Sequence, residues 1–465
     1  MARRWFTVVC LALLTAGCAS ITALDPRRAQ FALPAFEPPA PVLHELSGGV
    51  PVFLLEDHDL PLVRLTLSFR GGSVYDPPSQ AGLADVAGPA WRTGGTAGFA
   101  PEALDEALDE RAIQLSVSLG RSTGQLVLST LRWDLDRALE LLEQVLWRPT
   151  FREERVVWAR TQVQERLLRE ADDPQSLAFR EFRRALYPGH PRGVLATPES
   201  VAAVGRPEVE ALHRRLLTEG TWVVGAVGDF DAGNLLAELE RRFGSLPADG
   251  GGFPPLAPPQ PPAPRVVLVP KDVPQATLVW GRLGPDRLDP EFYALDLVEQ
   301  VVGGSGFQSR LVREVRSNRG LAYSVGSFYQ ALPGFGVLGA SAQTRADAVV
   351  EVRGAVAAIL GQVAAEGITA EELSRARDAV VNRHVFRYQD PGSAVWERMS
   401  LRLEALPEDL PSLYLPAVIA VALEGARNAA HWFDGGTGVT VVVGPLTAAE
   451  LEIPGGPPVE VVEVR

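Results

Sequence analysis

The sequence predicts an α+β protein of two homologous domains, each a mostly antiparallel sheet with helices packed on one face. Two observations predict this class. The run 246–265, "LPADGGGFPPLAPPQPPAPR", is rich in Pro and Gly, has no apolar period and separates two long segments. Both segments repeat one order of patterns, in which two helices precede a β-rich run followed by glycine. We therefore expect domains at 42–248 and 266–446, a linker at 249–265 and a tail at 447–465.

The start of the chain has the composition of an export signal. "MARRWFTVVCLALLTAGCAS" begins with basic residues and continues with an apolar stretch too short to span a bilayer comfortably, before small residues lead to Cys18. The "TAGC" ending resembles a bacterial lipobox. It implies removal of residues 1–17, a lipid on Cys18 and a location at the outer membrane facing the periplasm. The alternative is an ordinary signal peptide cut nearby. Residues 18–41 predict a proline-rich tether.

Alternating and β-rich runs predict strands in both halves. "LVRLTLSFRGGS" at 62–73 alternates polar and apolar residues, as an antiparallel strand with one buried face does. "TWVVGAVGDF" at 221–230 and "TGVTVVVGPL" at 437–446 are β-rich runs at corresponding places of the two halves. This correspondence indicates that the halves are copies of one fold.

Paired helices precede these final runs. "DLDRALELLEQVL" at 134–146 and "ADAVVEVRGAVAAIL" at 346–360 predict the first helix of each pair. A longer helix follows in each half, and each is predicted to open with a Thr-x-x-Glu capping box and to stop at an Asp-Pro. These capping residues and prolines are, in chain order, Thr150, Glu153, Pro174, Thr369, Glu372 and Pro391.

Charge and cysteine content exclude several classes of function. The formal net charge of −13 over 465 residues argues against nucleic acid or an anionic membrane surface as a main partner. The chain has 2 cysteines, Cys10 and Cys18, both near the N-terminus. The predicted domains therefore contain neither a disulfide framework nor a thiolate zinc site.

Three stretches carry a resemblance to a known family. They are "LPLVRLTLSFRGGSVYDPPSQAGLA" at 60–84, "DDPQSLAFREFRRALYPGHPRGVLATPESVAAV" at 172–204 and "GGSGFQSRLVREVRSNRGLAYSVGSFY" at 303–329. Together they resemble the insulinase/pitrilysin family of zinc peptidases, the inverzincins, which includes the mitochondrial processing peptidase. The resemblance covers nearly the whole mature chain.

The family's H-x-x-E-H motif is altered in "GLADVAGPAWRTGGT" at 82–96. In active members two histidines one helical turn apart bind zinc, the Glu between them takes a proton from the zinc-bound water, and a distant Glu completes the ligand set. The resemblance places Asp85, Gly88 and Pro89 at the first His, the Glu and the second His, and Glu165 at the distant ligand.

These substitutions remove the groups that the family's chemistry needs. Gly88 has no side chain that could act as a base, and Pro89 cannot ligate zinc and disturbs a helix interior. The resemblance therefore implies no metal or cofactor on this chain, with zinc on a partner. Glu165 is interpreted as a solvated helix residue or a remnant of a lost site. No pair of histidines has the spacing of a metal site on a helix; they are His44, His58, His190, His213, His384 and His431.

The second half keeps another feature of the family. Active members use an Arg and a Tyr seven residues apart to hold the substrate backbone and stabilise the tetrahedral intermediate, and Arg316 and Tyr323 match them in type and spacing. The alternative is a surface Arg beside a half-buried Tyr. The Gly-rich "GGSGFQSRL" at 303–311 has the look of a phosphate loop, but lacks the Lys-Ser/Thr of one, so a turn into a helix explains it.

The resemblance implies a non-catalytic subunit of a periplasm-facing zinc peptidase. Family enzymes form a clamshell of four such domains, and some short members pair an active chain with an inactive one. This chain would form half of the chamber, pair with an H-x-x-E-H homologue and present Arg316 and Tyr323 to a peptide substrate. Two alternatives remain: a binding or scaffold lipoprotein without peptidase activity, and a metallopeptidase with an aberrant metal site.

Overall fold

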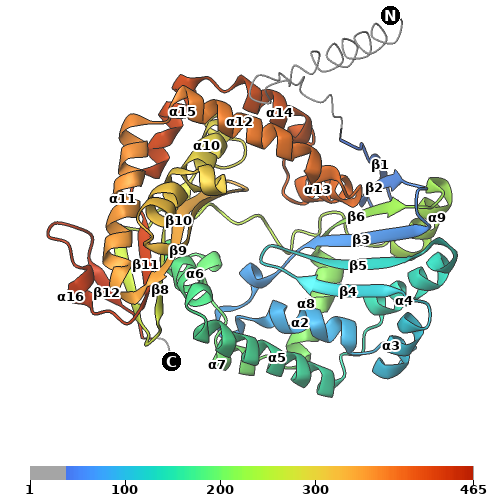
Figure 1. Ribbon diagram of the computed structural model, residues 1–465. Coiled ribbons are helices and arrows are strands. Elements are labelled where there is room, and N and C mark those ends of the chain that lie inside the picture. The colour runs from blue at the N-terminus through green and yellow to red at the C-terminus, as the bar shows by residue number, and fades with distance from the viewer. Residues whose placement is uncertain (1–37, 464–465) are drawn as a thin grey trace, which may run out of the picture. The chain divides into compact units, whose positions relative to one another are not determined.

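Two six-stranded sheets organise the chain in the computed structural model, which describes residues 38–463 (Figure 1). The predicted signal peptide, most of the tether and Cys18 lie outside these described residues. The first sheet has the order β1-β2-β6-β3-β5-β4, and the second has the order β12-β7-β11-β8-β10-β9. Because the second order matches the first strand for strand from the second position to the sixth, the halves share one topology.

The strands of each sheet come from one half of the chain. The first sheet contains β1 (Val42–Glu45), β2 (Pro51–Glu56), β3 (Leu62–Arg70), β4 (Gln114–Leu119), β5 (Thr123–Leu131) and β6 (Thr221–Gly228). The second contains β7 (Arg265–Pro270), β8 (Gln275–Gly284), β9 (Ala322–Leu332), β10 (Phe335–Arg345), β11 (Val439–Gly444) and β12 (Val459–Val461). Most pairs are antiparallel, but β2 runs parallel to β6 and β7 runs parallel to β11 and β12. Each sheet is therefore mixed.

The helices also follow one order in the two halves. The first half has α2 (Leu83–Thr93), α3 (Pro101–Asp109), α4 (Leu135–Trp147), α5 (Glu153–Asp172), α6 (Pro174–Leu186), α7 (Pro198–Ala202), α8 (Arg206–Glu219) and α9 (Ala232–Phe243). The second has α10 (Phe292–Glu299), α11 (Val349–Glu366), α12 (Ala370–His384), α13 (Gly392–Leu403), α14 (Leu410–Ala420), α15 (Leu423–Ala429) and α16 (Ala448–Leu451). The predicted fold class, two homologous α+β domains, is confirmed.

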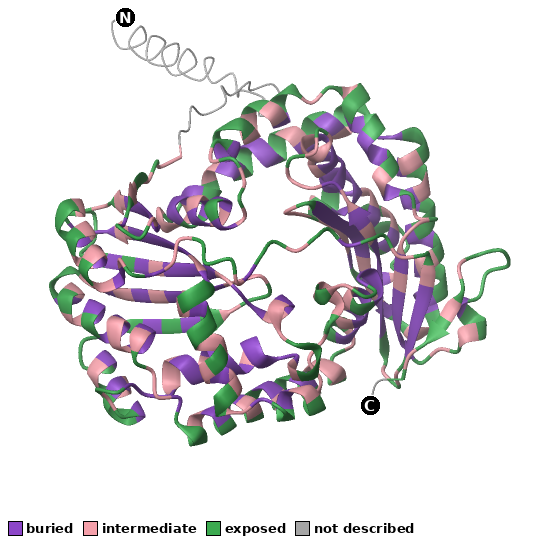
Figure 2. Ribbon diagram, turned by 180° about the vertical axis from the view of Figure 1, so that it is seen from behind, coloured by how far each residue is buried: buried purple, intermediate pink, exposed green. Residues whose placement is uncertain are grey.

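Each half covers one face of its sheet with its own helices. In the first half, Val86 of α2, Leu142 of α4 and Val156 of α5 pack with strand residues such as Leu65 in one core (Figure 2). The second half builds its own core in the same way from α10, α11 and α12. By length and composition α11 could cross a membrane. Its packing in this core explains its apolar residues.

The opposite faces are covered by two helices exchanged between the halves, which the sequence did not predict (Figure 1). Phe182 on α6 of the first half packs in one cluster with Val279 and Val441 of the second sheet. Met399 on α13 of the second half packs in another cluster with Phe53 and Val223 of the first sheet. The halves are therefore held together by reciprocal apolar packing, which stabilises in proportion to the area removed from water.

One of the two predicted capping boxes is wrong. Thr369 accepts a hydrogen bond from the backbone N–H of Glu372 and forms the predicted box at the start of α12. In α5, however, the N-cap is Arg152, and the Thr150 hydroxyl donates to the carbonyl of Gly94 at 2.9 Å. The backbone N–H of Thr150 also donates to Gly95, so tertiary pairing with that loop holds the threonine away from the helix end.

The two Asp-Pro pairs separate helices, as predicted, but each also leads into an exchanged helix. Pro174 is the first residue of α6, where its missing N–H costs nothing, and the Asp173 carboxylate caps that helix by accepting from Ser176 at 2.7 Å. Pro391 directly precedes α13. The Pro- and Gly-rich run forms neither helix nor strand before β7, and its Phe253 is buried against the first core.

Candidate functional site

The altered zinc motif lies on α2, which packs against α5. A left-handed backbone at Gly82, with φ of 101°, leads into the helix, and the Asp76 carboxylate accepts hydrogen bonds from the N–H groups of Gly82 and Ala84 at 3.1 and 3.2 Å. Burial raises the pKa of Asp76 to about 7. The family's strand-turn-helix entry is therefore intact even though the motif residues have changed.

Asp85 and Glu165 are both engaged by arginines. The carboxylate of Asp85 lies 2.9 Å from the guanidinium of Arg166, which is on α5. Glu165 is half exposed and lies 3.8 Å from Arg169 one helical turn away. Its position fits the interpretation of a solvated helix residue.

Gly88 and Pro89 leave no reactive group at the centre of α2. Gly88 is buried, and a Cβ built on it would lie 3.4 Å from the backbone nitrogen of Leu119 in β4. Pro89 sits inside the helix, and its carbonyl accepts a hydrogen bond from the Thr93 hydroxyl at 2.8 Å. The helix continues through the proline to Thr93.

Zinc does not fit the residues at this site. A zinc site of this family needs two imidazoles and a distant carboxylate, and the equivalent positions hold Asp85, which is paired with an arginine, Pro89, which has no ligand atom, and the half-exposed Glu165. Among residues 38–463, no group of three or more His, Cys, Asp or Glu side chains is placed to hold a metal ion. The geometry therefore gives no support to a metallopeptidase with an aberrant metal site.

Arginines occupy the space beside α2 instead. A cavity of about 320 Å³ is lined by Asp85 and Glu170 but also by Arg121, Arg166, Arg180 and Arg183. Sequence analysis did not single out these arginines. The run "FREFRR" at 179–184 indicates a cluster of arginines. Which of them face the cavity depends on how α6 packs, and the sequence does not show this.

The structure brings Arg316 and Tyr323 together on the surface. Arg316 lies in the π-helical turn Val312–Asn318, and Tyr323 lies in β9, the edge strand of the second sheet. The Arg316 guanidinium is 6.0 Å from the centre of the Tyr323 ring and 5.3 Å from that of Phe307. Tyr323 is 74% exposed and Phe307 is 71% exposed. The predicted alternative of a half-buried tyrosine therefore does not describe Tyr323.

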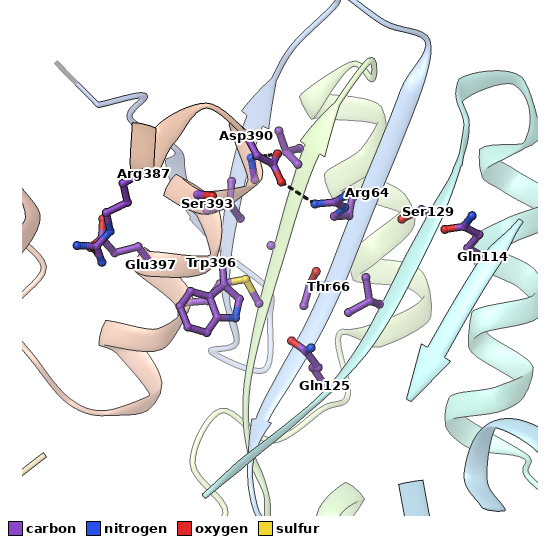
Figure 3. Close-up of a pocket in the computed structure, with 16 residues that line it drawn as sticks. Arg64, Thr66, Gln114, Gln125, Ser129, Arg387, Asp390, Ser393, Trp396 and Glu397 are labelled. Atoms are coloured by element: carbon purple, nitrogen blue, oxygen red, sulfur yellow. Dashed lines mark hydrogen bonds and ion pairs between the residues drawn. The ribbon is translucent and has the colours of Figure 1, made fainter. Parts of the chain in front are cut away.

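A cavity of about 570 Å³ lies between the first sheet and α13 (Figure 3). Polar side chains of β3 and β5, among them Thr66 and Gln125, line one side, and Trp396 of α13 lines the other. Arg64 crosses its rim to pair with Asp390 at 3.0 Å. No sequence pattern indicates this cavity, because it is formed where an exchanged helix meets the other half's sheet.

The fold and the altered site together define a class: a homologue of two-domain zinc peptidases in which the helix equivalent to the metal-binding one lacks the zinc ligands. The pattern of the family described as "Insulinase (Peptidase family M16)" matches residues 52–195, and that of "Peptidase M16 inactive domain" matches residues 203–380. The chain belongs to the insulinase (M16) family, as a non-catalytic homologue.

Relatives in the family include both peptidases and a non-peptidase. An uncharacterized zinc protease of Mycobacterium tuberculosis is 31% identical over 267 residues, which are 56% of this chain and 60% of that protein. The non-peptidase homolog YmxG of Helicobacter pylori is 28% identical over 285 residues, which are 60% of this chain and 65% of that protein. The chain thus spans 60 to 65% of the length of these relatives.

Solved structures share the fold at low sequence identity. A peptidase M16 inactive domain from Pseudomonas fluorescens superimposes with a TM-score of 0.79 at 23% identity, over 88% of this chain and 98% of that one. The periplasmic protease PqqL of Escherichia coli superimposes with a TM-score of 0.71 at 16% identity, over 93% of this chain but 50% of PqqL. The fold of this two-domain chain therefore corresponds to half of the PqqL chain.

Proposed function

We propose that this chain is the zinc-free subunit of a two-chain insulinase-family peptidase. The observation that carries the proposal is the contrast between the two sites. The zinc helix has lost its ligands, while Arg316 and Tyr323 remain adjacent and exposed on the second domain. A pair that serves a zinc site has a use on this chain only if another chain supplies that site. The equivalence of the chain to half of PqqL supports such pairing.

In the assembled enzyme the pair would act on a substrate held at the partner's metal. Arg316 would donate charge-assisted hydrogen bonds to the peptide backbone, and the Tyr323 hydroxyl would donate to the oxyanion that develops on the scissile carbonyl. The partner's zinc would polarise that carbonyl. The exposure of Tyr323 suits this role, because its hydroxyl is free to meet a substrate that lies outside this chain.

A test of the proposal uses co-expression with a homologue that carries an intact H-x-x-E-H motif. We expect a heterodimer that cleaves an unstructured peptide, and Tyr323→Phe is expected to leave assembly unchanged and to lower turnover about a hundredfold to a thousandfold. Tyr293→Phe is the matched control, because it removes one hydroxyl from the same domain at a half-buried ring away from the pair. Full turnover in the Tyr323→Phe complex would reject the role of the pair.

A double variant sharpens this result. Adding Arg316→Ala to Tyr323→Phe should lower turnover by less than the product of the two single effects, because both groups act on one transition state. If the reduction in turnover of the double variant equalled the product of the two single reductions, the two side chains would not act jointly on one substrate.

We also propose that the chain is anchored in the outer membrane, facing the periplasm, through a lipid on Cys18. The support is the short apolar segment that ends in "TAGC". Cys18→Ser should release the protein into a soluble fraction and abolish labelling by a fatty-acid probe. Equal labelling of both proteins would reject the anchor.

A second candidate function is a binding or scaffold lipoprotein without peptidase activity. The similarity to YmxG, a non-peptidase homolog, favours it. The two candidates differ in what the chain binds. A scaffold would not form a catalytic complex with a zinc-bearing homologue, and exchange of Arg316 or Tyr323 would then leave its binding unchanged.

A further inference from the structure

Arginines outnumber acids in three cavities that share one arginine. The cavities have volumes of about 320, 370 and 520 Å³ and Arg121 lines all three; α2 lines the first of them, and α6 lines the first and the second. The arginines that line them are Arg70, Arg121, Arg166, Arg180, Arg183 and Arg192, whereas the acids are Asp85, Glu170 and Glu404. Because the whole chain carries a formal charge of −13, this concentration of cations does not follow from composition.

Two of the arginines are neutralised within the chain. Arg166 pairs with Asp85 at 2.9 Å. Arg180 lies 3.7 Å from Glu170 and donates to the backbone carbonyl of Ala196 at 2.6 Å. These two side chains are therefore held in place by groups of the protein itself.

Arg121 and Arg183 are not neutralised. Among residues 38–463, neither has a carboxylate within 4 Å, and the Nε of Arg183 is sealed from solvent with no acceptor. Burial, together with the nearby Arg121 and Arg180, lowers the pKa of Arg183 to about 10. A half-buried cation beside other cations is unfavourable unless an anion joins them, and such sites are often functional.

Part of the wall of one of these cavities is aromatic. The 370 Å³ cavity that contains Arg121 and Arg183 is also lined by Phe179, Tyr187 and Phe328, and the rings of Phe179 and Phe328 are 5.9 Å apart. A guanidinium binds a carboxylate through two parallel hydrogen bonds, and an aromatic wall accommodates an apolar side chain. A divalent cation is repelled by the same arginines.

We propose that the pocket defined by Arg121 and Arg183 binds the carboxylate of an acidic peptide, with a neighbouring apolar side chain against the aromatic wall. The proposal rests on the proposed function in one respect, that the ligand is a peptide. The helix that corresponds to the cation-binding helix of active members, α2, lines the 320 Å³ cavity, which Arg121 and Arg183 also line.

The test measures binding of fluorescent peptides to the purified full-length chain alone, by fluorescence anisotropy. One peptide carries Phe-Glu, and its matched partner carries Phe-Gln with an amidated C-terminus. We expect the acidic peptide to bind at least about tenfold more tightly, with an advantage that shrinks as salt is raised. Arg183→Gln should remove the advantage and leave the weak binding of the neutral peptide unchanged. Arg169→Gln, which removes an exposed arginine of α5 outside the cavities, is the matched control and should change neither affinity.

Two further measurements keep the proposal open to refutation. Arg121→Gln changes an exposed side chain, so it tests the pocket even if Arg183→Gln impairs folding, and it should also reduce the advantage of the acidic peptide. Equal binding of the two peptides, or an advantage that survives both variants, would overturn the proposal. Binding of inorganic phosphate without a preference for the acidic peptide would also overturn it. Because no partner and no cleavage are involved, this result is separate from the assembly and turnover that test the proposed function.

Discussion

The two halves of this protein share a topology and differ in what their equivalent helices carry. α2 follows β3 in the first half, and α10 follows β8 in the second. On α2 the polar group is Asp85, which faces a cavity and pairs with an arginine. On α10 the polar groups are Asp296, which is half-buried, and Glu299, which is buried. One fold thus supports an open charged pocket in one copy and a pair of acids directed into the packed interior in the other.

The acids of α10 are satisfied by neutral partners. Tyr414 donates to Asp296 at 2.5 Å, and Ser327 donates to Glu299 at 2.8 Å. Burial raises the pKa of both acids, that of Glu299 to about 7, while Arg383 counters the shift. The difference teaches that loss of the zinc ligands did not close the first site. The first site is a cavity lined by four arginines and two acids.

The largest change in stability is expected when a contact made by an exchanged helix is removed. Phe182→Ala should lower the free energy of unfolding by about 3–5 kcal/mol, because it empties a buried site between α6 and the second sheet. The ring lies so close to β8 that a Cβ on Gly281 would come within 2.6 Å of it. Chemical denaturation measures the change.

The matching contact in the other direction is Met399. Met399→Ala should lower the free energy of unfolding by about 2–5 kcal/mol, since Met399 packs against the first sheet beside Gly225. Phe386→Ala removes an exposed ring between α12 and α13 and is the control for both. If either core variant were as stable as the control, the exchanged helices would not hold the halves together.

The buried acid of the second half predicts a pH dependence. Between the ordinary pKa of 4.5 and the raised value of about 7, folded Glu299 holds a proton that the unfolded chain has lost, so stability falls as pH rises through this range. Glu299→Gln cannot ionise. The loss of stability between pH 5 and pH 8 should therefore be smaller in the variant by about 2–3 kcal/mol.

Burial also raises the pKa of Asp76, but Asp76 is present in both proteins. The difference in pH dependence between wild type and Glu299→Gln therefore reports on α10. Urea denaturation at the two pH values provides the measurement. Parallel pH profiles for the two proteins would show that Glu299 is ionised in the folded chain throughout.

Two threonines near the starts of α5 and α12 test whether equivalent positions in the two halves have the same role. The Thr369 hydroxyl accepts a hydrogen bond as an N-cap and donates to the Glu372 carboxylate at 3.0 Å, and an asparagine side chain can both accept and donate, so Thr369→Asn should change stability by less than about 0.5 kcal/mol. Thr150 instead donates to the Gly94 carbonyl, and an ionised aspartate cannot donate. Thr150→Asp should therefore lower the free energy of unfolding by about 1–2 kcal/mol, measured by thermal denaturation. Equal costs would mean that both threonines have the same role.

The smallest effect is expected at the remnant of the zinc site. Glu165→Ala should change the free energy of unfolding by no more than about 0.5 kcal/mol, because its pairing with Arg169 at 3.8 Å is exposed. Addition of a chelator should likewise leave the denaturation midpoint unchanged. A chelator-sensitive midpoint that is lost in Glu165→Ala would point to a bound metal and contradict the fit described above.

The sequence by itself determined the class of fold and the loss of the zinc chemistry. Alternating runs and β-rich runs predicted strands correctly at β3, β6 and β11, because local periodicity reflects which face is buried. Gly88 and Pro89 lack the required functional groups in any fold. The resemblance to the family implied the pairing of Arg316 with Tyr323, and the structure places the Arg316 guanidinium 6.0 Å from the centre of the Tyr323 ring.

Tertiary structure decided where the elements meet. Nothing in the amphipathic pattern of α6 or α13 shows that its apolar face belongs to the sheet of the other half, because burial is the same whichever sheet provides it. The role of Thr150 depended on a loop 56 residues away in sequence, and the neutralisation of Asp85 depended on the packing of α5 against α2. The pocket of Arg121 and Arg183 likewise exists only once α5, α6, the turn between β4 and β5 and the second sheet converge, and the linear sequence does not fix the distances on which its electrostatic interactions depend.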